Sequence, residues 1–315
     1  MKCRVCSSKN IKDHSLYRPY KDYKTYLYEC QDCGCRFCSY DEGIHEKLHK
    51  TESGYSIHDN HASRALELFK EKKTEKLREH LSRLAKNKFI IDQISKCPKN
   101  VKILETGCSK GYLTSYFISC GYEILGTDIS EEALEDARRN FGDHFCNIMS
   151  HKVKDQAPYD IIFHVGTVGC VSDPIGFMEN LLSLLKPGGK IIFNAPNIEF
   201  CMETGFPWAL TPPPDLVTVF PPDFWKKKFG DRTSVELKIV NFSKSRSVMW
   251  RYFTNFAQAD VSENLLFNDN ARGSEKLSSK LIRKVLVVFS IVYSFILPIK
   301  PVPDSVGVMV SMTKK

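Results

Sequence analysis

The sequence predicts an α/β protein in which helices flank a mostly parallel sheet, preceded by a small cysteine-rich module. Two observations lead to this prediction. Apolar runs of strand length alternate with helical patterns from residue 101 onward, and six of the 12 cysteines fall within the first 38 residues. At 315 residues, with 42% hydrophobic and 26% charged residues, the chain suffices for one α/β domain and an accessory module. This composition excludes collagen, disordered chains and multi-span membrane proteins.

Charge is distributed unevenly along the chain. Residues 101–220 contain 8 Lys and Arg against 15 Asp and Glu, whereas residues 221–315 contain 16 against 8. The formal net charge of +8 therefore belongs to the regions on either side of an acidic middle. A uniformly basic surface would indicate nucleic-acid binding, and this distribution indicates it only weakly.

The first 40 residues contain two separated cysteine pairs. Cys3-x-x-Cys6 begins the chain, and Cys30-x-x-Cys33 follows after 23 intervening residues. Each pair forms a turn that presents two thiolates, and two such turns complete a tetrahedral zinc site without an open coordination position. The spacing therefore predicts a zinc-ribbon module over residues 1–40, with Zn²⁺ in a structural role.

Other interpretations of this segment remain open. Cys35-x-x-Cys38 offers a second pair shifted in register, and the cysteines can also be reduced thiols or a redox pair. Gly34 is expected to take a positive φ in the turn after Cys33. No apolar stretch follows Lys2 as it would in a secretory signal, so we expect a cytoplasmic location, where clustered cysteines favour a metal over disulfides.

Residues 41–97 are predicted to form a helical connector. A helical pattern covers residues 61–95, because apolar residues recur at three-, four-, seven- or eight-residue steps among Lys and Glu. These residues are Leu66, Phe69, Leu77, Leu81, Leu84 and Ile91.

A strand–turn–helix–strand unit begins the domain predicted for residues 98–315. Val101–Glu105 is a short apolar strand, Thr106–Gly111 a glycine turn, Tyr112–Cys120 a helix, and Glu123–Thr127 a second strand that ends in Asp128. Glycines let the polar tail of a nucleoside approach the backbone at a helix N-terminus. A carboxylate at the end of the second strand then accepts hydrogen bonds from both ribose hydroxyls.

A dinucleotide-binding enzyme is the obvious alternative, but its turn has three glycines in the pattern G-x-G-x-x-G. Here only Gly107 and Gly111 are present, and the acid Glu105 lies two residues before Gly107. The runs E-T-G-C-S-K-G and G-T-D-I-S resemble the class I S-adenosylmethionine-dependent methyltransferases, which begin with acid-x-Gly-x-x-x-Gly. The resemblance implies that Glu105 lies near the methionine end of S-adenosylmethionine, that Gly107–Gly111 form the cofactor loop, and that Asp128 binds the ribose.

The same resemblance continues downstream. Asp160–Val165 looks like the fourth strand, which ends beside the transferred methyl group, and Asp173-Pro174 begins a helix running to Leu185. Leu185–Asn197 looks like the turn and fifth strand. Val235–Val240 and Val306–Met312 are expected to form the antiparallel last pair of a seven-stranded, Rossmann-like sheet. Further cofactor contacts implied by the resemblance are Cys108, Ile129 and His164.

A later segment resembles one bacterial branch of this family. Trp208, Pro213, Pro214, Phe220 and Pro222 match a Trp…Pro-Pro…Phe-x-Pro pattern of a branch associated with sugars and surface polysaccharides. That branch commonly has a cysteine-paired N-terminal module. The resemblance implies O-methylation of a sugar, a glycan or another small hydroxylated acceptor.

The sequence departs from this branch where its histidine bases are expected. Gly169-Cys170 occupies the place of a Glu-His pair, and Leu216 replaces a histidine after the paired prolines. An alcohol acceptor benefits strongly from a base. His164 and Asp215 are the nearest substitutes, and the catalytic residues are left unassigned.

Two other functions compete with this interpretation. One is an RNA base methyltransferase with a zinc module, for which the basic first 100 residues would contact RNA. The acidic middle and the lack of an Asn/Asp-Pro-Pro-Tyr tetrapeptide make nucleic acid the less favoured partner. The other is a non-catalytic S-adenosylmethionine-binding protein that has lost its bases.

Residues 281–299 are predicted to form an apolar helix inserted before the last strand. The run Val285–Leu297 is almost uninterrupted and is flanked by Arg283, Lys284 and Lys300. Thirteen residues fall short of the roughly 20 that span a bilayer. The segment is interpreted either as a core or subunit-interface helix, or as a peripheral contact with the inner face of the membrane.

Overall fold

The computed structural model describes residues 1–20, 23–46, 56–198, 214–239 and 307–315. Its larger sheet has seven strands in the order β10-β11-β8-β7-β4-β5-β6. Neighbouring strands are parallel except where β11 takes part, since β11 runs antiparallel to both β8 and β10. The predicted seven-stranded fold with an antiparallel last pair is therefore confirmed. The strands are β4 (Lys102–Thr106), β5 (Glu123–Asp128), β6 (Phe145–Asn147), β7 (Tyr159–Val165), β8 (Leu185–Pro196), β10 (Thr233–Ile239) and β11 (Gly307–Lys314).

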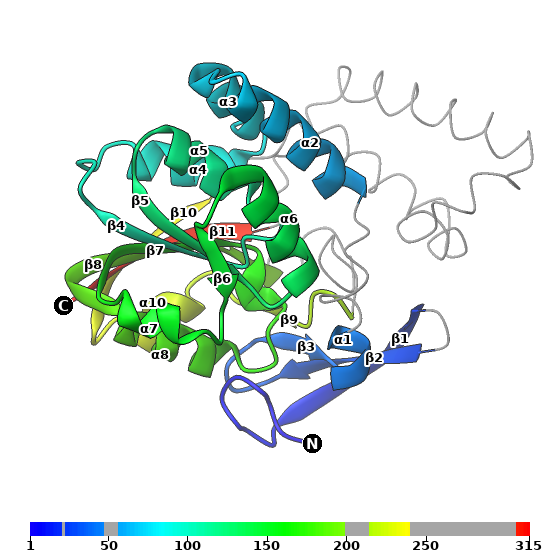
Figure 1. The fold of residues 1–315 in the computed structure, drawn as a ribbon. Coiled ribbons are helices and arrows are strands. Elements are labelled where there is room, and N and C mark those ends of the chain that lie inside the picture. Colours follow the sequence, from blue (N-terminus) through cyan, green and yellow to red (C-terminus); the bar gives the residue numbers. More distant parts are fainter. Residues whose placement is uncertain (21–22, 47–55, 199–213, 240–306) are drawn as a thin grey trace, which may run out of the picture.

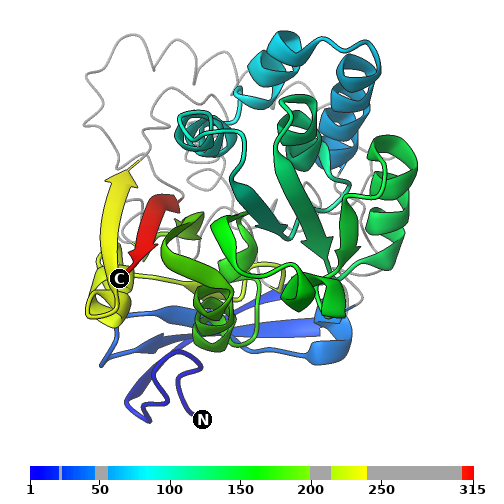
Figure 2. The same cartoon turned by 60° about the vertical axis from the view of Figure 1, so that its left-hand side comes forward.

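Helices cover both faces of this sheet (Figures 1 and 2). One face carries α4 (Ala85–Ile94), α5 (Tyr112–Ser119) and α6 (Glu131–Phe141), and the other carries α7 (His151–Asp155), α8 (Pro174–Ser183) and α10 (Phe224–Phe229). The helix expected after Asp173 begins there because the Asp173 side chain accepts a hydrogen bond from the Gly176 N–H (2.9 Å). It ends at Ser183, two residues earlier than predicted.

The connector predicted to be helical over residues 61–95 forms three helices in place of one continuous helix. They are α2 (Ser56–Lys70), α3 (Thr74–Leu81) and α4. The first break includes Lys72, whose φ of 54° is left-handed and therefore incompatible with a continuing helix. Leu77, Leu81 and Ile91 are fully buried in one cluster with residues of α5. Leu66, Phe69 and Leu84 are half-buried. The apolar period thus identified part of the buried face but did not show where the chain turns.

A second, four-stranded sheet joins the N-terminal module to the rest of the protein. Its order is β1 (Ile11–Tyr20), β2 (Tyr23–Cys30), β3 (Arg36–Cys38) and β9 (Thr218–Val219). A short helix, α1 (Glu42–Glu46), follows β3. Strand β9 pairs antiparallel with β3 through Arg36 opposite Val219 and Phe37 opposite Thr218. The module's sheet is therefore completed by a strand from the distant C-terminal half, as Figure 1 shows beneath the larger sheet.

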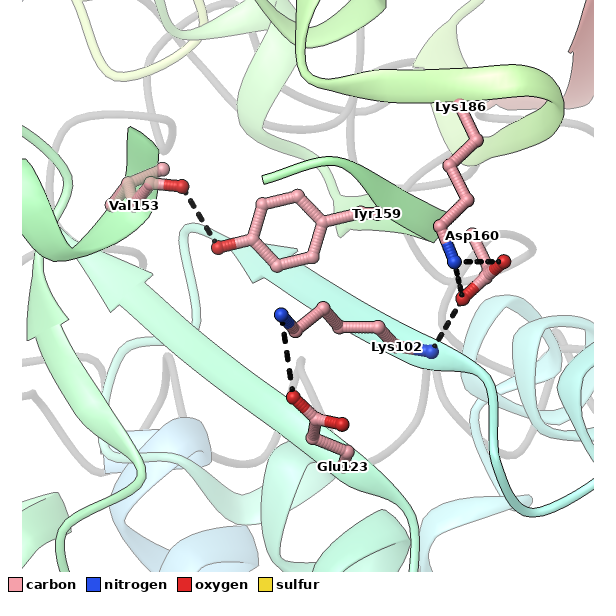
Figure 3. A network of polar contacts seen from close by, with 6 residues as sticks. All are labelled: Lys102, Glu123, Val153, Tyr159, Asp160 and Lys186. Atoms are coloured by element: carbon pink, nitrogen blue, oxygen red, sulfur yellow. Dashed lines mark hydrogen bonds and ion pairs between the residues drawn. The ribbon is translucent and has the colours of Figure 1, made fainter. Parts of the chain in front are cut away.

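Polar contacts hold together the amino ends of three strands of the larger sheet (Figure 3). The Asp160 carboxylate accepts hydrogen bonds from the Lys102 backbone N–H (2.8 Å) and from the Lys186 ammonium (2.8 and 2.9 Å). The Tyr159 hydroxyl donates to the Val153 carbonyl (3.0 Å). Because these contacts occupy the amino edge, the opposite, carboxyl edge is the place to look for a ligand site, as in other open parallel sheets.

Three features of the sequence lie outside the described residues: the apolar segment 281–299, Trp208 and Pro213. Within the described ranges, no helix is long and apolar enough to cross a membrane.

Candidate cofactor and metal sites

The turn between β4 and α5 has a tightly constrained backbone. Gly107, Ser109 and Gly111 all have positive φ, at 74°, 49° and 74°. The Gly107 and Cys108 N–H groups both donate to the Thr127 carbonyl, at 2.7 and 2.9 Å. A Cβ atom on Gly107 would lie 2.3 Å from the Thr167 hydroxyl oxygen, so only glycine fits there. The predicted glycine loop is thus folded against the end of the neighbouring strand β5.

Asp128 lies at the carboxyl end of β5, as predicted. Its two carboxylate oxygens accept hydrogen bonds from the Ser109 N–H (2.8 Å) and the Ser130 N–H (2.9 Å). Ser130 in turn caps α6 through its hydroxyl and the Ala133 N–H (3.3 Å). Asp128 remains half-buried. Its carboxylate is therefore held in one orientation beside the glycine loop while staying accessible to a ligand.

Glu105 lies behind this loop at the end of β4 and is only 3% exposed. Its carboxylate accepts a hydrogen bond from the Thr114 hydroxyl of α5. Burial, with a smaller contribution from the Asp128 charge, raises the pKa of Glu105 to about 8, although the Thr114 contacts oppose the rise. A cationic group of a ligand placed beside this buried acid would favour its ionised form, because the opposite charge offsets the cost of burial.

Two apolar side chains are exposed next to this carboxylate pair. Ile129 follows Asp128 directly and is 38% exposed, and Met149, two residues after β6, is 86% exposed. The strands that they follow, β5 and β6, are neighbours in the sheet, so both side chains lie at the same edge. Met149 was not identified from the sequence, because a single methionine after a three-residue strand gives no recognisable pattern. Cys108, in contrast, is 3% exposed, and burial raises the pKa of its thiol well above the usual value.

His164 is not brought together with these residues. Glu105 is opposite Phe163 in the β4–β7 pairing, and the Phe163 ring contacts Phe117 of α5. Because side chains alternate along a strand, His164 faces the other side of the sheet. There its ring stacks on Phe193 at 4.9 Å between centroids, and burial lowers its pKa to about 3. His164 is therefore a neutral, buried side chain on the face opposite Glu105.

The four cysteines predicted to bind zinc lie together. All four sulfur atoms are within 4.8 Å of one another, with 3.7 Å between Cys3 and Cys33 and 3.5 Å between Cys6 and Cys30. Thiolates about 2.3 Å from a tetrahedral zinc lie about 3.8 Å apart, so the spacing fits such an ion. Contact with Cys33, followed by burial, raises the pKa of the Cys3 thiol in the metal-free protein.

The third cysteine pair does not belong to this group of four, although the Cys35 thiol contacts Cys33. Cys35 and Cys38 are fully buried, and the Cys38 thiol points at the Leu216 carbonyl, 3.9 Å away. Gly34 takes the expected positive φ of 71° in the turn that precedes them. The geometry thus favours the unshifted register.

A groove of about 490 Å³ lies between this module and the sheet domain and is lined in part by Arg36 and Pro221.

The two positions at which the sequence lacks histidines face each other. The short 3₁₀ helix η2 (Thr167–Gly169) follows β7, and the Gly169 carbonyl accepts a hydrogen bond from the Val217 N–H (2.8 Å). The sulfur of Cys170 lies 4.0 Å from a carboxylate oxygen of Asp215. The structure therefore places a thiol and a carboxylate at this end of the sheet.

A family model described as a methyltransferase domain matches residues 69–232, just over half of the chain. The chain belongs to this methyltransferase family. The match covers α3 to α10 and includes every residue of the carboxylate and glycine-loop site. Together with the strand order, it confirms the expected class I methyltransferase fold.

Similar proteins share part of the methyltransferase sequence. A ubiquinone biosynthesis O-methyltransferase of Coxiella burnetii is 31% identical over 127 residues, which cover 38% of this chain and 53% of that protein. The corresponding protein of Idiomarina loihiensis is 31% identical over 104 residues, covering 30% and 42%. The chain thus spans about half the length of the curated relatives it matches. Among solved structures, the plantazolicin methyltransferase BamL with SAH is 15% identical, covers 86% of this chain and 96% of its own, and has a TM-score of 0.43.

The close approach of Thr167 to Gly107 gives a testable consequence for this methyltransferase. We expect Gly107→Ala to lower the free energy of unfolding by more than Gly121→Ala does. Both glycines have similar left-handed φ values, 74° and 78°, which cost an alanine about 1–2 kcal/mol, but a Cβ on Gly121 meets nothing within 4 Å. Urea unfolding of both variants measures the difference, which isolates the contact with Thr167. Equal losses in the two variants would contradict the packing described here.

Proposed function

We propose that this protein transfers a methyl group from S-adenosylmethionine, bound at the carboxyl ends of β4, β5 and β6. The observation that carries the proposal is the Asp128 carboxylate, held beside the glycine loop by Ser109 and Ser130. When bound, the cofactor supplies an electrophilic methyl group on a sulfonium sulfur. The residues of the chain hold and orient it.

Each residue of the site has a proposed role. Asp128 accepts hydrogen bonds from the ribose hydroxyls, and the backbone of residues 107–111, including Gly107, Cys108 and Gly111, surrounds the methionine portion. Glu105 pairs with the α-ammonium group. Ile129 and Met149 provide apolar surfaces for the adenine ring, since both are exposed beside Asp128. His164 is not included, because it lies on the opposite face of the sheet.

We propose a small hydroxylated molecule as acceptor, and oxygen as the methylated atom. The names of the curated relatives support an oxygen acceptor. A sugar or glycan is the class that the Trp…Pro-Pro…Phe-x-Pro resemblance favours. Cys170 and Asp215 add two polar groups at the end of β7, which suits a hydroxylated molecule.

We also propose that Cys3, Cys6, Cys30 and Cys33 bind one structural zinc ion, and that the chain divides into a zinc ribbon (1–40), a helical connector (41–97) and a methyltransferase domain (98–315). The four thiols support the metal because their spacing suits tetrahedral coordination. A peripheral membrane contact through residues 281–299 is proposed on the apolar sequence and its basic flanks alone.

The cofactor assignment is tested by calorimetry with S-adenosylmethionine. We expect wild-type protein to bind it and Asp128→Ala to weaken binding by about 1.5–3 kcal/mol, the cost of removing a charged hydrogen-bonding partner. Asp143→Ala removes an exposed carboxylate with a side chain 88% accessible and should bind normally. Tight binding of NAD together with no binding of S-adenosylmethionine would show that the cofactor is wrong.

The raised pKa of Glu105 predicts that cofactor binding releases a proton. With a pKa of about 8, most Glu105 is protonated at pH 7, and pairing with an ammonium group ionises it. Titrations in buffers of different ionisation enthalpy should show close to one proton released at pH 7, and Glu105→Gln should abolish the release. In the ligand-free protein the same group lowers the free energy of unfolding as pH rises from about 4.5 to about 8, since the folded state binds the proton more tightly. Proton release that persists in Glu105→Gln would rule out this role.

The zinc assignment predicts about one zinc per chain. Cys3→Ser and Cys30→Ser should lose it, because each removes one of four thiolates. Cys97→Ser serves as the control, since its thiol lies after α4 and donates to the Gln93 carbonyl (3.8 Å), away from the cluster. Elemental analysis of protein purified without chelator measures the content. A metal-free N-terminus that still resists proteolysis would overturn the zinc ribbon.

A further inference from the structure

A second polar cluster lies at the carboxyl end of β7, outside the proposed cofactor site. It consists of Lys86 at the start of α4, Cys170 after η2, and Asp215 in the segment before β9. Asp215 is only 8% exposed, and its carboxylate lies 4.0 Å from the Cys170 sulfur. Lys86 interacts electrostatically with both. Three chain segments far apart in sequence thus bring a cation, a thiol and a carboxylate together.

The cluster is separated from the cofactor loop by one short 3₁₀ turn. The Thr167 hydroxyl, at the start of η2, donates to the Thr106 carbonyl (3.2 Å) and is the group that a Cβ on Gly107 would strike. Gly169, at the end of η2, accepts from the Val217 N–H, which fixes the segment that carries Asp215. An acceptor seated at the cluster therefore lies next to the loop that binds the cofactor.

The electrostatics of the cluster keep the Cys170 thiol neutral. Burial lowers the pKa of Lys86, while Cys170 and Asp215 oppose that change. Burial, followed by the Asp215 charge, raises the pKa of the Cys170 thiol well above its usual value, and Cys38 of β3 adds to this rise. The charge of Lys86 opposes the rise, but the thiol stays neutral. Asp215 is therefore the proton acceptor that the cluster offers, since a neutral thiol is not a base.

We propose that Asp215 is the general base for the acceptor hydroxyl. The inference rests on the proposed methyl transfer. The acceptor O–H bond breaks and its proton passes to the Asp215 carboxylate. The acceptor oxygen forms a bond to the methyl carbon while the bond from that carbon to sulfur breaks, and the sulfur keeps the electron pair. Release of the proton from Asp215 to solvent completes the cycle.

Steady-state methylation of 3,4-dihydroxybenzoate, used as a probe hydroxyl acceptor, tests the base. Asp215→Asn should lower kcat at pH 7 by about 10²–10⁴-fold, while the affinity for S-adenosylhomocysteine stays within about twofold. Asp223→Asn, which removes a half-exposed carboxylate paired with Lys227, should change neither. A wild-type kcat in Asp215→Asn overturns the proposal. Failure of the wild-type protein to bind S-adenosylhomocysteine would instead overturn the proposed function.

Alkylation of Cys170 by iodoacetamide, followed by peptide mass spectrometry, tests the cluster without an acceptor. Asp215→Asn should speed alkylation and Lys86→Met should slow it, because the two charges act oppositely on the thiolate fraction. Equal alkylation rates in the wild type and both variants would show that these side chains do not interact. That result would overturn the proposal even if the probe acceptor is not methylated.

Discussion

The contact between the end of β5 and the loop after β4 determines the geometry of the whole carboxyl edge. The Thr127 carbonyl accepts two loop N–H groups, and the next residue, Asp128, accepts a third from Ser109. These bonds require Gly107 in a left-handed conformation. They also bring Gly107 against Thr167, which lies in the turn after the neighbouring strand β7. One backbone carbonyl and one carboxylate therefore fix three neighbouring strand ends relative to one another.

From this contact, a continuous series of hydrogen bonds runs to the N-terminal module. The turn after β7 begins at Thr167, which bonds to Thr106, and ends where Gly169 bonds to Val217. The Val217 carbonyl accepts from the Cys38 N–H (3.1 Å), and β3 pairs with β9 directly afterwards. The cysteine-rich module thus supports the segment that carries Asp215.

Local patterns in the sequence were sufficient for the parts of the site that lie close together in the chain. Glu105, the glycine loop and Asp128 fall within one strand–helix–strand unit, whose spacing is fixed by the geometry of parallel pairing. The cysteine pairs were recognised for the same reason, since each turn is local. The apolar period of the connector predicted Leu77 and Ile91 as core residues, and both are buried.

The sequence could not reveal features that depend on tertiary packing. The face on which His164 lies depends on the exact pairing of β7 with β4, and a one-residue difference moves it to the other side of the sheet. Lys86 and Asp215 are 129 positions apart, and neither stands in a distinctive motif. Pairing of β9 with β3 joins residues that belong to different predicted domains. These contacts arise only when α4, η2 and the N-terminal sheet pack around the same strand ends.

The most direct test of the account is a crystal structure of the protein with S-adenosylhomocysteine. The account predicts density at the carboxyl edge of the larger sheet, with ribose hydroxyls within hydrogen-bonding distance of Asp128 and the adenine between Ile129 and Met149. Density for the nucleoside in the groove beside Arg36 and Pro221, or on the His164 face of the sheet, would contradict it.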